Sequence, residues 1–162
     1  ASQVDDPIGN KFGYIEGLKL QNADGIIRNL VDNVACGGNL CLNVSPKSDG
    51  TIPEDQQQVL LKIGEWLQTY GEGIYGTRPY KTAIEGNIRL TCKDGFIYAF
   101  VLRWDGKPLT IQCLDSSKVK AVTCLADGRK VRIKKQADGL RIEATMPNAT
   151  DPVVCFKVKV RP

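Results

Sequence analysis

The sequence of 162 residues contains no histidine. This absence excludes Ser-His-Asp and Cys-His catalysis by the chain alone, and it removes a residue type that most zinc sites use. Six cysteines are present, but no two form a Cys-x-x-Cys pair. We therefore expect no metal and no cofactor. Most of the cysteines lie in apolar, strand-like segments, which predicts buried free thiols. One or two disulfides in the C-terminal half are the alternative.

Long apolar runs and strong charge are also lacking. No stretch approaches the roughly 18 apolar residues that a membrane-spanning helix needs, so we expect no membrane span. The formal net charge is only +4. The densest basic run, Arg129–Lys135, alternates charged residues with Val131 and Ile133. This pattern predicts the solvated face of a strand rather than a phosphate-binding stripe, and we expect no nucleic-acid partner.

The first part of the chain has an α/β pattern. A helix is predicted from Asn22, whose side chain can cap it, to about Ala35, and Gly37 follows where helices commonly end. Leu40–Val44 then predicts a short strand that is apolar enough to be covered on both faces. No other convincing strand is visible in the first 75 residues. We therefore expect the pairing partners of this strand to lie outside the chain.

A second helix follows in the same part. Thr51 and Glu54 have the spacing of a capping box, which predicts that Thr51 caps this helix. The helix is expected to run to about Tyr70, where Gly71 stops it. Its apolar stripe consists of Val59, Leu60, Ile63, Trp66, Leu67 and Tyr70.

The second part, from about Ile84, has an all-β pattern. Ile88–Cys92 and Phe96–Arg103 flank Lys93-Asp94-Gly95, which is a strong signal for a tight hairpin. The other predicted strands are Leu109–Leu114, Val119–Leu125, Lys130–Gln136, Leu140–Ala144 and Val153–Val160. About seven short antiparallel strands at this spacing predict a small β-sandwich.

Several motifs resemble those of α-L-fucosidases of the retaining glycoside hydrolase type. The motifs are Phe12-Gly13-Tyr14, Leu30-Val31-Asp32-Asn33-Val34, Gly37-Gly38-Asn39-Leu40, Leu42-Asn43-Val44-Ser45-Pro46, Asp49-Gly50-Thr51-Ile52-Pro53, Ile63-Gly64-Glu65-Trp66-Leu67 and Gly71-Glu72-Gly73-Ile74-Tyr75-Gly76-Thr77-Arg78-Pro79. The resemblance implies the last strand and last two helices of a (β/α)8-like barrel, an incomplete α/β barrel fragment over residues 1–80. It implies an all-β antiparallel sandwich domain over residues 81–162.

The resemblance also implies a chemistry. Such enzymes hydrolyse terminal α-L-fucosyl linkages of glycans with retention, using two carboxyl groups about 5–5.5 Å apart. The family's nucleophilic Asp lies on an earlier strand, and its motif is absent here. The general acid/base corresponds to Glu16, in Gly13-Tyr14-Ile15-Glu16-Gly17; the alternative is an ordinary exposed loop carboxylate. Phe12 and Tyr14 are the candidates for stacking on a sugar, and Leu40 is the candidate for contact with the fucose methyl group.

A chain with only the end of the barrel cannot hold both carboxyl groups. We expect the isolated chain to be incomplete and inactive, and the remaining barrel segment, as a second polypeptide, to supply the nucleophile. The alternative function is a non-catalytic β-sandwich module for interaction or carbohydrate binding. Family members are secreted, lysosomal or bacterial enzymes, so the resemblance leaves the compartment open. If the protein is secreted, Asn148-Ala149-Thr150 is a candidate glycosylation triplet.

Overall fold

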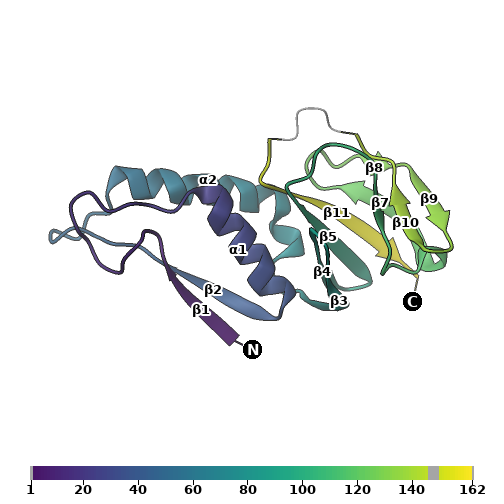
Figure 1. Ribbon diagram of the computed structural model, residues 1–162, viewed down its shortest axis with the longest axis horizontal. Helices are drawn as coiled ribbons and strands as arrows, with labels where there is room; N and C mark the ends of the chain where they lie inside the picture. The colour runs from purple at the N-terminus through teal and green to yellow at the C-terminus, as the bar shows by residue number, and fades with distance from the viewer. Residues whose placement is uncertain (1, 146–149, 162) are drawn as a thin grey trace.

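The computed structural model describes residues 2–145 and 150–161, so Asn148 and Ala149 of the glycosylation triplet lie outside the described residues. The molecule is elongated. An α/β unit built from the N-terminal part of the chain forms one end, and antiparallel sheets form the other (Figure 1).

The α/β unit begins with a strand that the sequence does not predict. Strand β1 (Ser2–Pro7) is followed by helix α1 (Ala23–Ala35) and strand β2 (Gly38–Asn43). The two strands pair in parallel, with Val4 opposite Leu40. The expectation that β2 has no partner within the chain is therefore wrong. The segment was missed because its two aspartates and its proline are residues that strands normally avoid.

Helix α1 forms as predicted. The Asn22 side chain accepts a hydrogen bond from the backbone N–H of Gly25 at 2.7 Å, which satisfies one of the free N–H groups at the helix start. The helix ends at Ala35 with Cys36 as its C-cap, and the following Gly37 has a φ of +82°, a conformation that glycine adopts without steric cost. The apolar residues Ile26, Ile27 and Val31 of α1 are buried against the rest of the molecule, whereas Leu30 and Val34 are half-buried.

Helix α2 (Glu54–Tyr70) also matches the prediction, and Ile63, Trp66 and Tyr70 of its stripe are buried. The predicted capping box is wrong. The Thr51 hydroxyl donates to the Asp49 carboxylate at 2.7 Å instead, and Pro53 occupies the cap position without a side-chain bond. Asp49, two residues earlier in the loop, competes successfully for the hydroxyl.

The rest of the chain forms two antiparallel sheets. A six-stranded sheet has the order β3-β4-β5-β11-β7-β8, and a three-stranded sheet has the order β6-β10-β9. The strands are β3 (Arg78–Glu85), β4 (Ile88–Lys93), β5 (Phe96–Leu102), β6 (Leu109–Ile111), β7 (Val119–Cys124), β8 (Lys130–Val131), β9 (Ile133–Gln136), β10 (Gly139–Ile142) and β11 (Val153–Val160); short 3-10 turns span Gly71–Gly73 and Ser116–Lys118. This arrangement is consistent with the predicted sandwich.

Two details of the sheets differ from the prediction. The all-β part begins with β3 at Arg78 rather than near Ile84. The predicted strand Lys130–Gln136 is divided at Arg132, because β8 pairs with β7 in one sheet while β9 pairs with β10 in the other.

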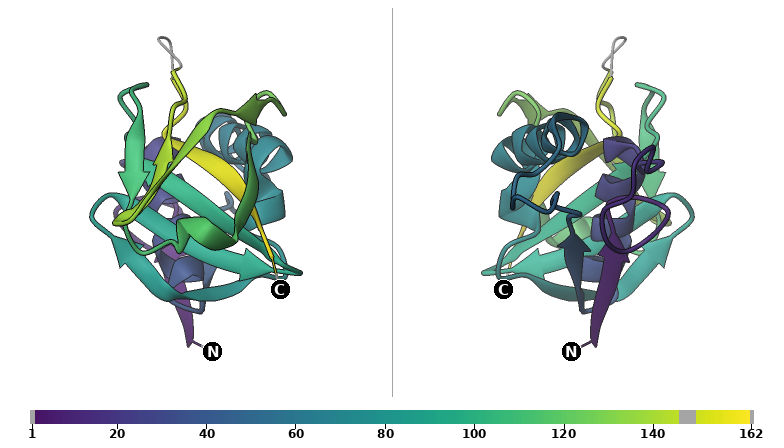
Figure 2. Two further views of the ribbon diagram at one scale, coloured as in Figure 1. Left: turned by 90° about the vertical axis from the view of Figure 1, so that its right-hand side faces the viewer. Right: turned by 90° about the vertical axis from the view of Figure 1, so that its left-hand side faces the viewer.

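The six-stranded sheet lies between two layers. On one face, Phe100 of β5 packs against Trp66 of α2, with ring centroids 6.2 Å apart. On the other face, Phe156 of β11 packs edge-on against Trp104, with centroids 5.3 Å apart. The helices therefore cover one face and the three-stranded sheet covers the other (Figures 1 and 2). The α/β unit and the sandwich share one apolar core, and the domain division near residue 80 stays a prediction.

The cysteines are less buried than predicted. All six are free thiols, but only Cys124 and Cys155 are buried, whereas Cys36 and Cys41 are exposed. Cys36 lies at the end of α1, and Cys41 lies on the uncovered face of β2, so tertiary position rather than local pattern decides their exposure. None of the described helices is both long and apolar enough to cross a membrane.

Candidate functional site

The carboxyl ends of β1 and β2 lie at the same edge of the N-terminal sheet because the strands are parallel. The loop of residues 8–22 follows β1, and the loop of residues 44–53 follows β2. The right-hand view of Figure 2 looks onto the long loop after β1. Ligand and active sites of parallel α/β folds lie at this edge. These two loops are therefore the candidate site.

The base of the loop of residues 8–22 is closed by backbone hydrogen bonds. The N–H of Ile8 donates to the carbonyl of Asn43 at 2.8 Å, which ties this loop to the end of β2. The N–H of Gln21 donates to the carbonyl of Ile8 at 2.9 Å, and Asn10 bonds Lys19 in the same way. Ile8 is completely buried. The loop thus has a fixed base and a projecting tip.

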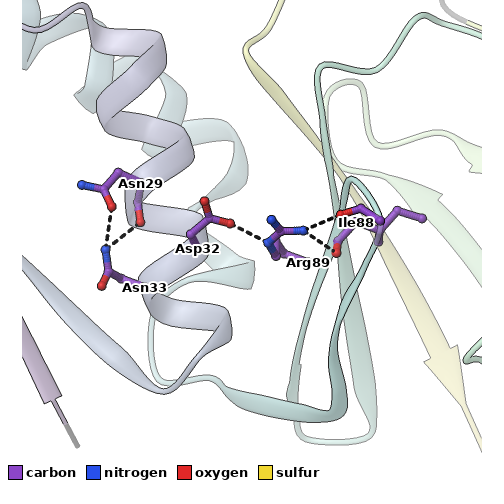
Figure 3. A network of polar contacts seen from close by, with 6 residues as sticks. Asn29, Asp32, Asn33, Ile88 and Arg89 are labelled. Atoms are coloured by element: carbon purple, nitrogen blue, oxygen red, sulfur yellow. Dashed lines mark hydrogen bonds and ion pairs between the residues drawn. The ribbon is translucent and has the colours of Figure 1, made fainter.

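Asp6 connects this base to helix α1. Its carboxylate accepts hydrogen bonds from the Gln21 side chain at 3.1 Å and from the Asn29 side chain at 3.0 Å. Asn29 in turn accepts from Asn33 at 2.8 Å, one turn further along α1, as Figure 3 shows. Asp6 therefore has a structural role at the foot of the loop, in contrast to its exposed neighbour Asp5.

Three of the predicted site residues lie together on the tip. Phe12 is 64% exposed, Tyr14 is 44% exposed, and Glu16 follows two residues later, also exposed. Within the part of the chain that the structure describes, Glu16 makes no hydrogen bond or ion pair. Its apolar neighbours Phe12 and Ile15 are open to solvent and do not enclose the Glu16 carboxyl.

A groove of about 600 Å³ separates the loop tip from the start of α2. The sequence did not predict its α2 side. Its lining consists of Tyr14, Ile15, Gly17, Leu18, Lys47, Pro53, Glu54, Asp55, Gln56 and Gln58. Carboxylates, amides and one ammonium group around an open groove can hydrogen-bond a ligand rich in hydroxyl groups.

Gln56 holds the second loop against α2. Its buried side-chain amide accepts from the N–H of Ser45 at 2.8 Å and donates to the carbonyl of the same residue at 3.0 Å. A signal for this residue existed in the sequence. Gln56 lies seven residues before Ile63, on the buried face of the helix, where an apolar residue would be expected.

The structure does not bring Leu40 together with these residues. Leu40 is half-buried in a different cleft of about 620 Å³, which Leu30 and Val34 of α1 and Tyr75 also line. This cleft lies where β2 and α1 meet the segment that leads into β3. Among the described residues, no group of three or more Cys, Asp or Glu side chains is placed to hold a metal ion.

The sandwich presents little aromatic surface. Tyr98, Phe100, Trp104 and Phe156 are all buried, and Phe96 is half-buried. The basic residues of the run Arg129–Lys135 are exposed, as predicted for a solvated strand face. These features do not favour a stacking platform for sugars on the sandwich.

Comparisons with known proteins give consistent results. A sequence model of the family described as alpha-L-fucosidase matches residues 2–72. An α-L-fucosidase of Dictyostelium discoideum is 37% identical over 152 residues, which cover 88% of this chain and 32% of that protein. The human tissue α-L-fucosidase is 40% identical over 99 residues, covering 57% of this chain and 21% of that protein.

Solved structures agree over the whole fold. α-L-fucosidase isoenzyme 1 of Paenibacillus thiaminolyticus superposes with a TM-score of 0.87 at 27% identity, covering 99% of this chain and 40% of that one. The α-fucosidase of Thermotoga maritima superposes with a TM-score of 0.82 at 32% identity, covering 96% and 39% respectively. The chain spans about a third or less of the curated relatives it matches.

Proposed function

We propose that this chain, which belongs to the α-L-fucosidase family, is the C-terminal part of an enzyme that hydrolyses terminal α-L-fucosyl linkages of glycans. A solved structure of the similar Thermotoga maritima enzyme is a complex with fucose. The observation that carries the proposal is the loop at the carboxyl ends of β1 and β2. Its tip presents Glu16 beside Phe12 and Tyr14, at the edge where parallel α/β folds place their active sites.

We further propose that the N-terminal sheet is completed by more barrel strands. Within the described residues, β1 and β2 pair only with each other. The sheet face opposite α1 exposes the polar or small side chains of Gln3, Asp5, Asn39 and Cys41. Parallel sheets are normally covered on both faces, and a closed barrel leaves no free edge. The missing strands would come from a longer polypeptide or from the remaining barrel segment as a second polypeptide, which would also supply the nucleophilic Asp.

In the proposed retaining mechanism, the Glu16 carboxylic acid donates its proton to the glycosidic oxygen. The Asp carboxylate attacks the anomeric carbon and forms a covalent ester with the sugar, and the bond to the leaving group breaks. The Glu16 carboxylate then takes a proton from water, whose oxygen attacks the anomeric carbon. The bond between this carbon and the Asp breaks, which restores the Asp carboxylate and releases fucose with net retention. Phe12 and Tyr14 are the proposed substrate contacts, because they lie on the same loop tip as Glu16. Leu40 lines a separate cleft and is not among these contacts.

The assembled enzyme with Glu16→Gln tests this assignment. A natural fucosyl glycan needs protonation of its leaving group, whereas an aryl fucoside with a good leaving group needs little. We expect the variant to lose roughly 100-fold or more of kcat on the glycan and much less in the first step on the aryl fucoside. Glu65→Gln, an exposed change on α2, is the matched control. Unchanged activity of Glu16→Gln on the glycan would refute the assignment.

A further inference from the structure

A second polar cleft lies where helix α1 meets the start of the sandwich. It has a volume of about 530 Å³ and lies between α1, the turn before β4 and the end of β5. Its lining consists of Gly25, Arg28, Asn29, Asp32, Gly86, Asn87, Arg89, Leu102 and Arg103. Three arginines from three separate elements, Arg28, Arg89 and Arg103, thus line a cleft that has one acidic lining residue, Asp32. The formal charge of the lining is three positive and one negative, which leaves +2. We call it the three-arginine cleft.

Arg89 forms the rigid wall of the three-arginine cleft. Its side chain is only 15% exposed, and its Nε donates to the Asp32 carboxylate at 2.5 Å. Its Nη1 donates to the carbonyls of Gly86 and Ile88, at 2.9 and 3.1 Å, as Figure 3 shows for Asp32 and Ile88. Within the described residues Nη2 has no hydrogen-bond partner. One end of the guanidinium fork is therefore fixed while the other is free to donate.

The two other arginines belong to different elements, Arg28 to α1 and Arg103 to the residues directly after β5. Arg28 is half-buried on α1, and neither Arg28 nor Arg103 makes an ion pair within the described part of the chain. Arg103 has a φ of +55°, in the left-handed region that non-glycine residues avoid. The turn beside it is held firmly, since Asn87 exchanges two hydrogen bonds with Leu102, at 2.8 and 3.0 Å. An arginine kept in an unfavourable conformation at a cleft wall indicates a role for its side chain.

We propose that the three-arginine cleft binds a tetrahedral oxyanion, a sulfate or phosphate group. Guanidinium forks match the oxygen geometry of such anions, and three arginines from different elements suit an ion with more than two acceptor oxygens better than a carboxylate. The cleft is larger than the bare ion, so it also has room for a sugar that carries the group. This inference does not depend on the proposed fucosidase activity.

Titration of the full 162-residue chain with sodium sulfate tests the proposal. Ionic strength is held constant with sodium chloride, and the backbone amides of Gly86 and Asn87 are followed by NMR. We expect the chemical shifts of these amides to change with sulfate concentration and to reach saturation. Arg28→Gln and Arg103→Gly should each raise the half-saturating concentration roughly tenfold, since each removes a charge-assisted hydrogen-bond donor. Arg103→Gly also relieves the left-handed residue, so its melting temperature should equal or exceed that of the wild type. A loss of binding in this variant therefore does not reflect unfolding.

Controls separate this site from general salt effects. Arg129→Gln removes an exposed arginine that pairs with Asp127 outside the cleft, and it should bind sulfate like the wild type. Absent or non-saturable shifts, equal binding by Arg103→Gly and wild type, or equal binding of sodium acetate would overturn the proposal.

A titration with N-acetylglucosamine 6-sulfate identifies the source of the anion. Tighter binding than inorganic sulfate supports a sugar-borne group, and equal binding supports the free ion.

Discussion

The indole N–H of Trp66 on α2 donates a hydrogen bond to the backbone carbonyl of Val153 on β11, at 2.9 Å and across 87 residues of sequence. One helical turn later, the Tyr70 hydroxyl donates to the Asp151 carboxylate at 2.5 Å. Helix α2 is therefore fastened to the start of the central strand β11. The α/β unit with the candidate active-site loop and the sandwich should behave as one cooperative body.

We expect Trp66→Phe to lower the free energy of unfolding by roughly 1–3 kcal/mol, because the buried carbonyl of Val153 loses its partner. Urea unfolding followed by far-UV circular dichroism and by Trp104 fluorescence measures this change. Both signals should show the same single transition. The exposed change Tyr75→Phe serves as control and should stay within about 0.5 kcal/mol of wild type. Separate helix and sandwich transitions in the wild type would contradict the shared core.

Gly73 allows the turn after α2 to approach the sheet. A Cβ at this position would lie 2.6 Å from the Phe100 ring and 3.1 Å from Tyr98. We expect Gly73→Ala to destabilise the chain by roughly 1–3 kcal/mol through overpacking. Gly64→Ala is the matched control, because Gly64 lies inside α2 and an added Cβ would have no atom within 4 Å apart from its chain neighbours and the backbone of its own helix. It should stabilise the chain by about 0.5–1 kcal/mol. Thermal melts of the two variants should therefore shift in opposite directions.

Glu72 makes the stability of the fold depend on pH in the acidic range. Partial burial favours its neutral form, but hydrogen bonds from Lys157 and Tyr98 outweigh this and hold the pKa of Glu72 below its ordinary value. A carboxyl with a lowered folded-state pKa stabilises the fold above its unfolded pKa of about 4.3, and the contribution is lost as the pH falls through the folded pKa.

We therefore expect the melting temperature of Glu72→Gln to be lower than that of the wild type at about pH 7. The difference between the two melting temperatures should shrink toward about pH 3. Differential scanning calorimetry at a series of pH values measures it. A difference that stays constant over this range would show that the ionised carboxylate does not contribute.

The cysteines should react in an order set by their surroundings. Cys36 and Cys41 are exposed, whereas burial and the neighbouring Glu85 carboxylate raise the pKa of Cys113 to about 12, and burial raises the pKa of Cys155 strongly. Only thiolates react quickly. Peptide mass spectrometry after brief iodoacetamide treatment should find Cys36 and Cys41 modified and Cys113 and Cys155 unmodified. In denaturant all six cysteines should react. Early modification of Cys155 would mean that β11 is not buried as described.

Features determined by neighbouring residues in the chain were predictable. The Asn22 cap and the Asp94-Gly95 hairpin depend on local geometry, and both residues of this turn have positive φ, at 49° and 79°. Strand β1 was not predictable from local preference, because it is stabilised by pairing with β2 rather than by its own side chains. Thr51 was misassigned because a nearer partner, Asp49, takes its hydroxyl.

The candidate site was predictable only in part. The resemblance identified Glu16, Phe12 and Tyr14, and all three lie on one loop tip. The opposing side of the groove could not be derived from the sequence. Gln56 belongs to that side, and its hydrogen bonds with Ser45 exist only when the loop of residues 44–53 folds onto α2. The three-arginine cleft likewise combines three elements that are distant in the chain.

The most direct test of the central claim measures both the native mass and the α-L-fucosidase activity of the purified material that contains this chain. We predict fucosidase activity in a species well above 17.8 kDa, in which the missing barrel strands accompany this chain in one polypeptide or two. A homogeneous 17.8 kDa monomer that hydrolyses the fucoside by itself would contradict the need for a nucleophile from outside the chain. Larger species without fucosidase activity would contradict the proposed function.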